Sequence, residues 1–308
     1  MSSPSLLHQI DVTSSDGTRL RAWTNGGDGP TVLVSNGLGT NPHVWPTLLQ
    51  PDSGVRVIGW YHRGIGGSER PTSGRLEMDA HLEDAVAVMT ALDAASAVLV
   101  GWSIGVNVAF ELATQHPERV RGILAVAGVP GGTFSTTLAP LRVPPILAKT
   151  LMLSLARSAT VTGHAMAPVT RRIPWTRFSV DLLRMTRIVS PEADPALLQT
   201  AVQEFFATHP AWYARMALAA SRHPRVSLSS IAVPTTFLAG RSDLLAGAPA
   251  MRSAAARIPG ARYREVRGTH FIPLERPGVV LEELRALLVR IERAEPRGPG
   301  SDDPAQEA

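Results

Sequence analysis

From residue 31 onward the chain alternates between short runs of β-branched and apolar residues and longer stretches with helical spacing. Residues 31–35, 55–60 and 97–100 are runs of the kind that a parallel sheet buries on both faces. Between the second and third runs, apolar residues recur at helical spacing over residues 78–92. Repeated β–α–β units predict the α/β class, with a doubly wound, mostly parallel central sheet.

The alternation stops in the middle of the chain, which suggests an insertion. Residues 8–24 predict a β-hairpin, because strand-like residues flank turn formers. From about residue 133 the strand rhythm gives way to Leu, Ala, Arg and Pro, with helix-like stretches at 195–206 and 211–220. A strand returns at 235–239. We therefore expect a first core part (1–132), a helical cap insertion (133–230), a second core part (231–293) and a disordered tail (294–308).

The positive charge of the chain is concentrated in the expected insertion. The net charge is +4, yet residues 133–230 hold eleven Arg and Lys against four Asp and Glu, a local excess of +7. A solvated basic surface is the simpler interpretation. A basic lid favouring acyl groups that carry a carboxylate, or that are attached to an acidic carrier protein, is the alternative. No nucleic-acid-binding motif accompanies the charge, so we expect no nucleic-acid partner.

The sequence gives no sign of secretion or of a membrane span. Its start lacks the basic and apolar segments of a signal peptide, and the absence of cysteine excludes a disulfide framework. The longest weakly polar stretch, residues 94–110, contains polar and glycine residues and is shorter than the roughly 20 apolar residues of a spanning helix. A cytoplasmic location is the default expectation.

Residues 101–105, Gly-Trp-Ser-Ile-Gly, match the nucleophile-elbow pattern G-x-S-x-G. In this pattern a sharp strand-to-helix turn lifts the serine oxygen out of the backbone. Glycines are needed on both sides, because side chains there would collide where the strand crosses the helix. An apolar run precedes the pattern and an apolar helix follows it, as the motif requires. The pattern predicts Ser103 as a nucleophile.

With three further motifs the chain resembles the α/β-hydrolase fold family over about residues 8–290, apart from the insertion. Residues 36–39, Asn-Gly-Leu-Gly, stand where the family usually has His-Gly-x-Gly, and with His43 and Trp45 they resemble enol-lactone hydrolases. Residues 62–68 resemble the family's Asp-x-Arg-Gly-x-Gly-x-Ser loop, with Tyr61 in place of the usual Asp. This departure bears on how the loop is anchored and leaves the chemistry unaffected.

A serine nucleophile needs a base, and the base needs a group that orients it. Residues 268–277 resemble the family's histidine loop, and His270 follows the last predicted strand in the chain order Ser, acid, His. Residues 240–243 resemble the family's Gly-x-x-Asp, whereas the other position for the acid, after Ala127, offers no carboxylate. We therefore expect His270 as general base and Asp243 as the acid that orients it.

The other histidines have simpler interpretations. His8 lies in the predicted hairpin, His116 ends a helix, and His81 is expected to face away from the apolar stripe of its helix. His43 and His62 lie on loops that can approach the site, so either is a candidate for substrate contact.

The resemblance also assigns the oxyanion donors, which would be the backbone amides of Leu38 and Ile104. Neither Gly-x-Gly of the two glycine-rich loops continues to a third Gly at dinucleotide spacing, and no Walker sequence or metal-ligand cluster is present. We expect neither a cofactor nor a metal.

Together these features predict a serine hydrolase that cleaves a small-molecule carboxylic ester or lactone through an acyl-enzyme. The insertion would form a lid, with Trp175, Phe178, Trp212 and Tyr213 as candidate pocket walls, although core packing is the simpler role for them. A carbon–carbon bond hydrolase, an acyltransferase or a cofactor-free peroxidase would use the same triad and stays open. A ligand-binding protein that keeps the fold for sensing is the alternative from another class, and the complete triad argues against it.

Overall fold

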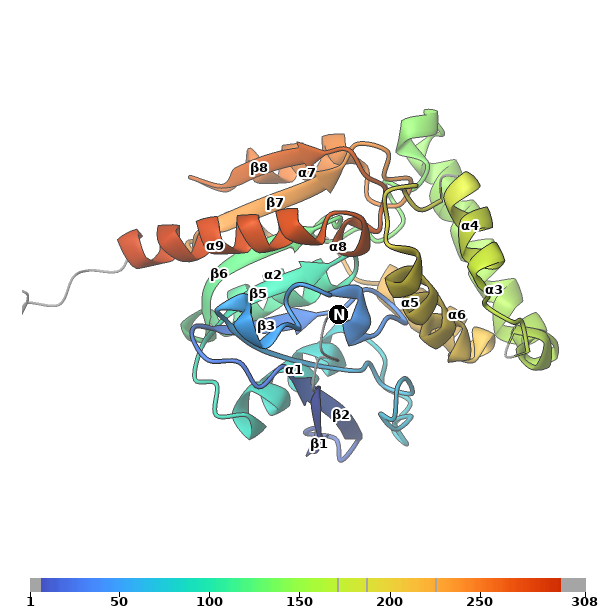
Figure 1. Cartoon of the computed structure of the whole chain (residues 1–308), viewed down its shortest axis with the longest axis horizontal. Coiled ribbons are helices and arrows are strands. Elements are labelled where there is room, and N and C mark those ends of the chain that lie inside the picture. The colour runs from blue at the N-terminus through green and yellow to red at the C-terminus, as the bar shows by residue number, and fades with distance from the viewer. Residues whose placement is uncertain (1–6, 171, 187, 225, 295–308) are drawn as a thin grey trace, which may run out of the picture.

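A computed structural model describes residues 7–170, 172–186, 188–224 and 226–294 and contains an eight-stranded sheet (Figure 1). The strand order is β1-β2-β4-β3-β5-β6-β7-β8. β1 pairs with β2, and β2 with β4, in antiparallel fashion, and all other neighbours are parallel. The prediction of a mostly parallel, doubly wound α/β sheet is confirmed.

The strands and the helices that flank them follow the predicted rhythm. The strands are β1 (His8–Thr13), β2 (Arg19–Thr24), β3 (Thr31–Ser35), β4 (Arg56–Trp60), β5 (Ala97–Trp102), β6 (Val120–Val126), β7 (Thr235–Gly240) and β8 (Arg262–Val266). The helices beside the sheet are α1 (Met78–Ala91), α2 (Gly105–Gln115), α7 (Ala248–Ala255), the short α8 (Ile272–Glu275) and α9 (Pro277–Ala294).

The sheet separates two hydrophobic cores. Leu99 of β5 packs in one core with Phe110 of α2 and Met251 of α7. Its neighbour Val100 packs in the other core with Leu284 of α9. This division follows from the strand itself, because successive side chains point to opposite faces. All six residues of β5 are buried, as expected for a central parallel strand.

Four helices between β6 and β7 form the cap and lie over one end of the sheet (Figure 1). They are α3 (Pro145–Thr170), α4 (Arg177–Met185), α5 (Pro195–Ala207) and α6 (Pro210–Ser221). All lie within the expected insertion 133–230. Of the predicted tail 294–308, Ala294 ends α9 and the rest lies outside the described residues.

Local signals explain where the cap helices begin and how they pack. The Asp194 side chain caps α5 by accepting hydrogen bonds from the backbone N–H groups of Ala196 and Leu197. The buried residues of α3 are small, and a Cβ on Gly163 would lie 2.5 Å from the backbone nitrogen of Ala211 in α6. Glycine at this position therefore permits the close approach of α3 to α6. Within the described ranges, no helix combines the length and hydropathy needed to cross a membrane.

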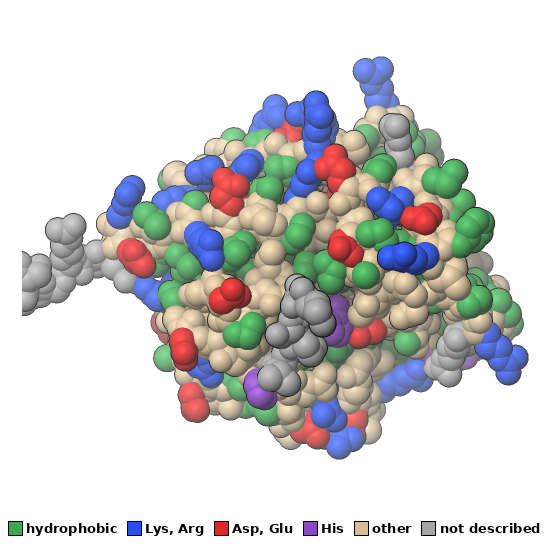
Figure 2. Space-filling model, viewed as in Figure 1, with side chains coloured by type: hydrophobic (Ala, Val, Ile, Leu, Met, Phe, Trp, Pro, Cys, Tyr) green, Lys and Arg blue, Asp and Glu red, His purple; other side chains and the backbone are tan. Residues whose placement is uncertain are grey.

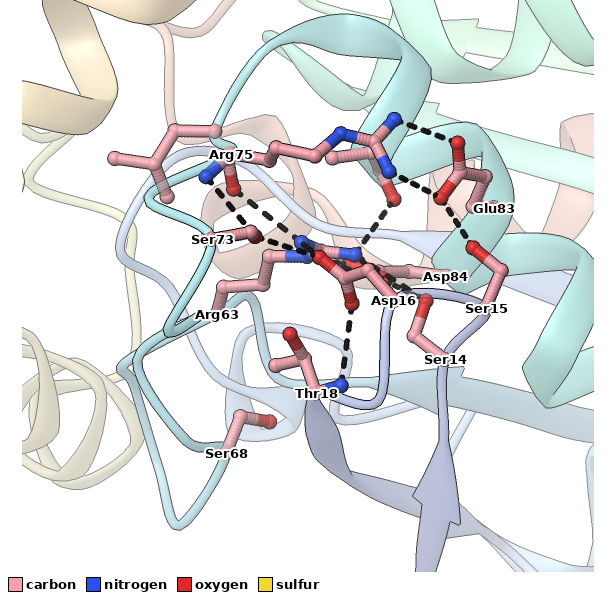
Figure 3. A network of polar contacts seen from close by, with 12 residues as sticks. Ser14, Ser15, Asp16, Thr18, Arg63, Ser68, Ser73, Arg75, Glu83 and Asp84 are labelled. Atoms are coloured by element: carbon pink, nitrogen blue, oxygen red, sulfur yellow. Dashed lines mark hydrogen bonds and ion pairs between the residues drawn. The ribbon is translucent and has the colours of Figure 1, made fainter.

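The buried side chain of Arg63 fastens the loop after β4 to the first hairpin and to α1. Figure 3 shows its guanidinium between two carboxylates, donating to Asp84 Oδ1 at 2.7 Å and to Asp16 Oδ2 at 2.6 Å. Ser14 Oγ donates to the same Asp84 oxygen at 2.6 Å. Arg63 and Asp84 are fully buried, so each charge depends on the other for compensation.

Two further contacts anchor this loop, although Tyr61 replaces the family's usual aspartate. Ser68 Oγ donates to the Tyr61 carbonyl oxygen at 2.7 Å and accepts from the Arg21 N–H at 2.9 Å. Trp212 Nε1 of α6 donates to the Arg63 carbonyl oxygen at 2.9 Å. The loop is therefore held from the sheet side and from the cap side.

His81, which was expected to face away from the apolar stripe of its helix, is nevertheless buried. His81 is 4% exposed, and its ring centroid lies 5.0 Å from that of His62, which is 2% exposed. The helix α1 is buried over a wider arc than its apolar stripe because His81 and Asp84 face the loop that contains Arg63.

This buried histidine pair predicts a loss of stability in mild acid. Burial and the neighbouring His81 lower the pKa of His62 to about 3, and burial lowers the pKa of His81 to about 4. In the unfolded chain both imidazoles bind protons near about pH 6.5, so the unfolded state holds more protons below that pH. The free energy of unfolding should therefore fall as the pH drops from about 6.5 towards 4.

Thermal unfolding measured between about pH 7 and 5 checks this expectation. His81→Phe keeps a ring of similar size without a titratable nitrogen, so its melting temperature should depend less on pH than that of the wild type. An equal pH dependence in both proteins would show that other groups dominate.

Candidate active site

Ser103 lies in a tight turn between β5 and α2, with a φ of +57°. This left-handed conformation is unusual for a residue with a side chain. Packing explains the glycines around it: a Cβ on Gly101 would lie 2.6 Å from the Gly105 carbonyl oxygen, and one on Gly105 would lie 1.9 Å from the Ser35 carbonyl oxygen. The close crossing of strand and helix therefore requires the two glycines that the motif supplies.

Three side chains from the ends of β5, β7 and β8 form one hydrogen-bonded chain. His270 Nε2 lies 2.9 Å from Ser103 Oγ. His270 Nδ1 lies 2.9 Å from Asp243 Oδ2 and 3.1 Å from its Oδ1. With the Nδ1 proton directed at the carboxylate, Nε2 is left to accept the serine proton. The structure thus brings the three predicted residues together in the order nucleophile, base and orienting acid.

Asp243 is held rigidly at the end of this chain. The residue has no solvent exposure, and its Oδ1 accepts hydrogen bonds from the N–H groups of Leu245 at 2.7 Å and Ala246 at 2.8 Å. A buried carboxylate needs such donors to compensate for lost hydration. These two hydrogen bonds fix the orientation of the Asp243 carboxylate towards His270.

Trp102, the residue before Ser103, positions the histidine loop. Its Nε1 donates to the His270 carbonyl oxygen at 2.8 Å, and its ring centroid lies 5.8 Å from that of His270. The variable residue of the G-x-S-x-G pattern therefore links the nucleophile turn directly to the base.

Glu275 supports the same loop and was not predicted as a functional residue. It is 4% exposed, and its carboxylate accepts from the Thr269 N–H at 2.7 Å, from Thr269 Oγ1 at 2.6 Å and from the Ser190 N–H at 2.7 Å. These bonds join the residue before His270 to the cap segment after α4. The signal in the sequence was that Glu275 is the one acidic residue in the motif 268–277.

A cavity of about 420 Å³ opens onto Ser103 between the core and the cap. The cap contributes mainly apolar side chains, among them Leu183, Ile188, Leu198, Val202, Phe205 and Tyr213. Uncharged polar groups come from Thr40, Asn107 and the threonines of residues 133–137. No Asp, Glu, Lys or Arg is among the described residues that line it. A wider surface depression of about 860 Å³, beside β1 and α1, includes none of the three triad residues.

Of the four aromatic residues expected as pocket walls, Tyr213 alone is among the described lining residues. Trp212 is buried against the Arg63 loop, Trp175 stacks on Phe206 with centroids 4.4 Å apart, and Phe178 is 79% exposed. Further aromatic lining, which the sequence did not indicate, comes from Phe134, Phe205, Phe206 and Phe271.

The two histidines considered for substrate contact lie outside the described cavity lining. His43 Nε2 is 3.2 Å from Glu204 Oε1, and His62 is buried beside His81. Neither residue has a position from which it contacts a molecule bound at Ser103.

The predicted oxyanion donors border the nucleophile. Leu38 and Ile104 both line the cavity together with Ser103. Neither backbone N–H donates a hydrogen bond to another described residue. Both amides are therefore available to an oxygen atom bound beside Ser103.

Comparisons with known sequences point to one family. A family model described as "alpha/beta hydrolase fold" matches residues 30–166. The 2-hydroxymuconate semialdehyde hydrolase of Pseudomonas sp. (strain CF600) is 35% identical over 125 residues, which are 39% of this chain and 44% of that protein. The putative carbamate hydrolase RutD of Caulobacter vibrioides (strain NA1000 / CB15N) is 36% identical over 98 residues, 32% of this chain and 36% of that protein. The chain thus spans less than half the length of these curated relatives.

Solved structures are similar over a larger part of the chain. The enol-lactonase from Burkholderia xenovorans LB400 has a TM-score of 0.70 at 24% identity, covering 91% of this chain and 100% of that one. Est816, described as an N-acyl homoserine lactone degrading enzyme, has a TM-score of 0.65 at 27% identity, covering 89% of this chain and 99% of that one. The similarity in structure therefore extends beyond the segment that the family model matches.

Proposed function

This chain is a member of the α/β-hydrolase fold family, and we propose that it is a serine hydrolase that cleaves a carboxylic ester or lactone through an acyl-enzyme. The observation that carries the proposal is the continuous hydrogen-bonded chain from Ser103 through His270 to Asp243 at the wall of the cavity. Such an arrangement turns a weakly nucleophilic hydroxyl into an effective nucleophile.

In the first half of the reaction, Ser103 Oγ attacks the carbonyl carbon while His270 Nε2 takes its proton. The carbonyl oxygen becomes negatively charged, and the amides of Leu38 and Ile104 donate to it. The bond to the leaving oxygen then breaks, and that oxygen takes the proton from His270. Asp243 stabilises the imidazolium throughout.

In the second half, a water molecule gives a proton to His270 and attacks the acyl carbon. Ser103 Oγ leaves, regains the proton, and the carboxylic acid is released. With a lactone, the alcohol and the acid formed in the two halves belong to the same molecule.

The cavity supports an uncharged, largely apolar acyl group. Its described lining contains no side chain that could pair with a carboxylate, and burying an unpaired charge costs several kcal/mol. The positive excess of the cap insertion would therefore act from the outer surface. This differs from the alternative in which the basic cap selects acyl groups that carry a carboxylate.

We expect the neutral diester of a dicarboxylic acid to be hydrolysed with a kcat/KM at least about 10-fold above that of its half-ester. The test compares kcat/KM for both substrates below and above about 0.15 M salt, because the higher salt concentration screens exposed charges. If the half-ester is preferred, and Arg172→Gln removes that preference, the cap charge rather than the cavity sets selectivity.

A carbon–carbon bond hydrolase is a second candidate because a curated relative is named 2-hydroxymuconate semialdehyde hydrolase. The muconate in that name carries a carboxylate, for which the described lining offers no cation. This favours the ester or lactone. Assays with a chromogenic ester and with a dicarbonyl compound, on the same purified protein, distinguish the two, and turnover of neither would favour a ligand-binding role.

We also expect Glu275→Gln to lower kcat by about 10- to 100-fold with little change in KM. A glutamine can place one oxygen but not two, so one of the three bonds to Thr269 and Ser190 is lost, at a cost of about 1–3 kcal/mol. His270 would then be positioned less well. The matched control is Glu282→Gln, which alters a 60% exposed side chain of α9. Equal kcat values in both variants would assign Glu275 a purely structural role.

A further inference from the structure

The long cap helix α3 presents its large apolar side chains to solvent. Leu147, Leu151 and Leu155 follow i, i+4 spacing, so they share one face of the helix, and they are 61%, 49% and 56% exposed. The residues that α3 buries are Ala148, Gly163 and Ala167. An ordinary surface helix has the opposite arrangement, with large apolar side chains inside and polar ones outside.

The next helix in the chain, α4, repeats the pattern. Phe178, Leu182 and Met185 are spaced i, i+4 and i+7 on one face and are 79%, 50% and 79% exposed. Figure 2 shows hydrophobic side chains gathered along the right-hand edge of the molecule, over α3 and α4. These six leucine, phenylalanine and methionine residues form what we call the α3–α4 face. Large apolar side chains gathered on one side of a protein in this way mark an interaction site.

The charge in the stretch of sequence that supplies most of this face is of one sign. Residues 133–180 contain six Arg and Lys and no Asp or Glu. The structure describes five of these cations, namely Arg142, Lys149, Arg157, Arg172 and Arg177. None of the five forms an ion pair with another described residue. The first acid beyond this stretch, Asp181 of α4, pairs with Arg184. A partner that complements this part of the cap would therefore be both apolar and anionic.

We propose that the α3–α4 face docks on the surface of an anionic lipid bilayer. Interfacial helices place an apolar face at the boundary of the acyl chains while their cations meet the headgroups. A second copy of the chain fits less well, because a two-fold interface would bring the same cations together. The apolar side chains protrude along α3, whose 26 residues span roughly 39 Å. A fluid bilayer surface can adapt its shape to such an extended row of side chains.

The face also borders the cavity. Ile188, just beyond α4, is 53% exposed and lines the cavity, and Leu183 of α4 lines it from within. An apolar ester dissolved in the bilayer would therefore reach Ser103 without entering water. This last step rests on the proposed hydrolysis, whereas the docking itself does not.

The test is sedimentation of the full chain with vesicles of phosphatidylcholine, alone or with about 30% phosphatidylglycerol, at about 0.1 M salt. We expect affinity for the anionic vesicles to exceed that for the neutral ones by at least about 10-fold. The variant Leu155→Ser, Phe178→Ser, Met185→Ser should lose at least about 10-fold in affinity. Val289→Ser, which alters a 43% exposed side chain of α9, is the matched control and should bind like the wild type.

A second variant tests the contribution of the positive charges separately from that of the apolar side chains. Arg142→Gln, Arg157→Gln, Arg177→Gln should weaken binding by on the order of 100-fold, about 5-fold for each cation. Ser103→Ala should bind vesicles like the wild type, so a failure of the proposed hydrolysis leaves this test intact. Absence of vesicle binding, binding unaffected by both triple variants, or a dimer that the serine variant dissociates would each overturn the proposal.

Discussion

Replacing Ser103 by alanine is expected to lower ester turnover by about 10⁶-fold while the protein stays folded. The members of a triad act as one unit, so the loss of the nucleophile leaves only the contribution of binding and of the oxyanion donors. The Ser103 hydroxyl is hydrogen-bonded to His270 Nε2. The turn that holds residue 103 depends on Gly101 and Gly105, which the substitution leaves in place.

Two measurements test this expectation. The first is turnover of a chromogenic ester by the variant, with Ser253→Ala as the control, because Ser253 is an exposed serine on α7. The second is covalent labelling by a fluorophosphonate followed by peptide mapping, which should place the label on Ser103. A label on another residue, with Ser103 unmodified, would reject the assignment of the nucleophile.

Asp243→Asn is expected to lower turnover by up to about 10⁴-fold. The amides of Leu245 and Ala246 need an acceptor, so they would hold the asparagine oxygen and turn its NH₂ group towards His270. Nδ1 would then accept a hydrogen bond, the proton would move to Nε2, and Nε2 could no longer accept the proton of Ser103. The variant therefore loses the negative charge of residue 243 and the His270 tautomer with a free Nε2, but it keeps the packing around residue 243.

The control for this variant is Asp181→Asn, since Asp181 is an exposed acid that pairs with Arg184 on the cap. Melting temperatures close to that of the wild type would show that the fold is preserved. If the activity of Asp243→Asn stays within about tenfold of the wild type, another carboxylate orients the base.

The sequence predicted those features that depend on neighbouring residues. The glycines beside Ser103 mark the elbow because they are a local steric requirement, which the short distances to Gly105 and Ser35 make visible. β7 ends at Gly240 and leads directly to Asp243, so the resemblance to Gly-x-x-Asp, together with the lack of a carboxylate after Ala127, predicted which acid meets His270. Both features can be recognised in the sequence without the tertiary structure.

What the sequence did not predict depends on contacts between distant segments. The Glu275 carboxylate accepts a hydrogen bond from Ser190, 85 positions away, and no local pattern links an acid at the end of α8 to a cap amide. The burial of His81 depends on a distant polar element, because its helix also packs against the loop of Arg63. Phe205 and Phe271 became cavity walls only because the cap folds over Ser103. Helical spacing shows which side chains share a face, but not what that face meets.

The hydrogen bonds between the cap and the core suggest a route to hybrid proteins. Hydrogen bonds join the cap to three separate parts of the core, pairing Trp212 with Arg63, Ser190 with Glu275 and Asn41 with Ala201. In each pair the core or the cap offers a backbone group, which any sequence supplies. The recipient keeps Glu275 and Asn41, so of these three bonds only the one from Trp212 requires a particular side chain in a cap transplanted from another protein of this fold. Exchange of caps would then alter the cavity walls and leave the triad as it is.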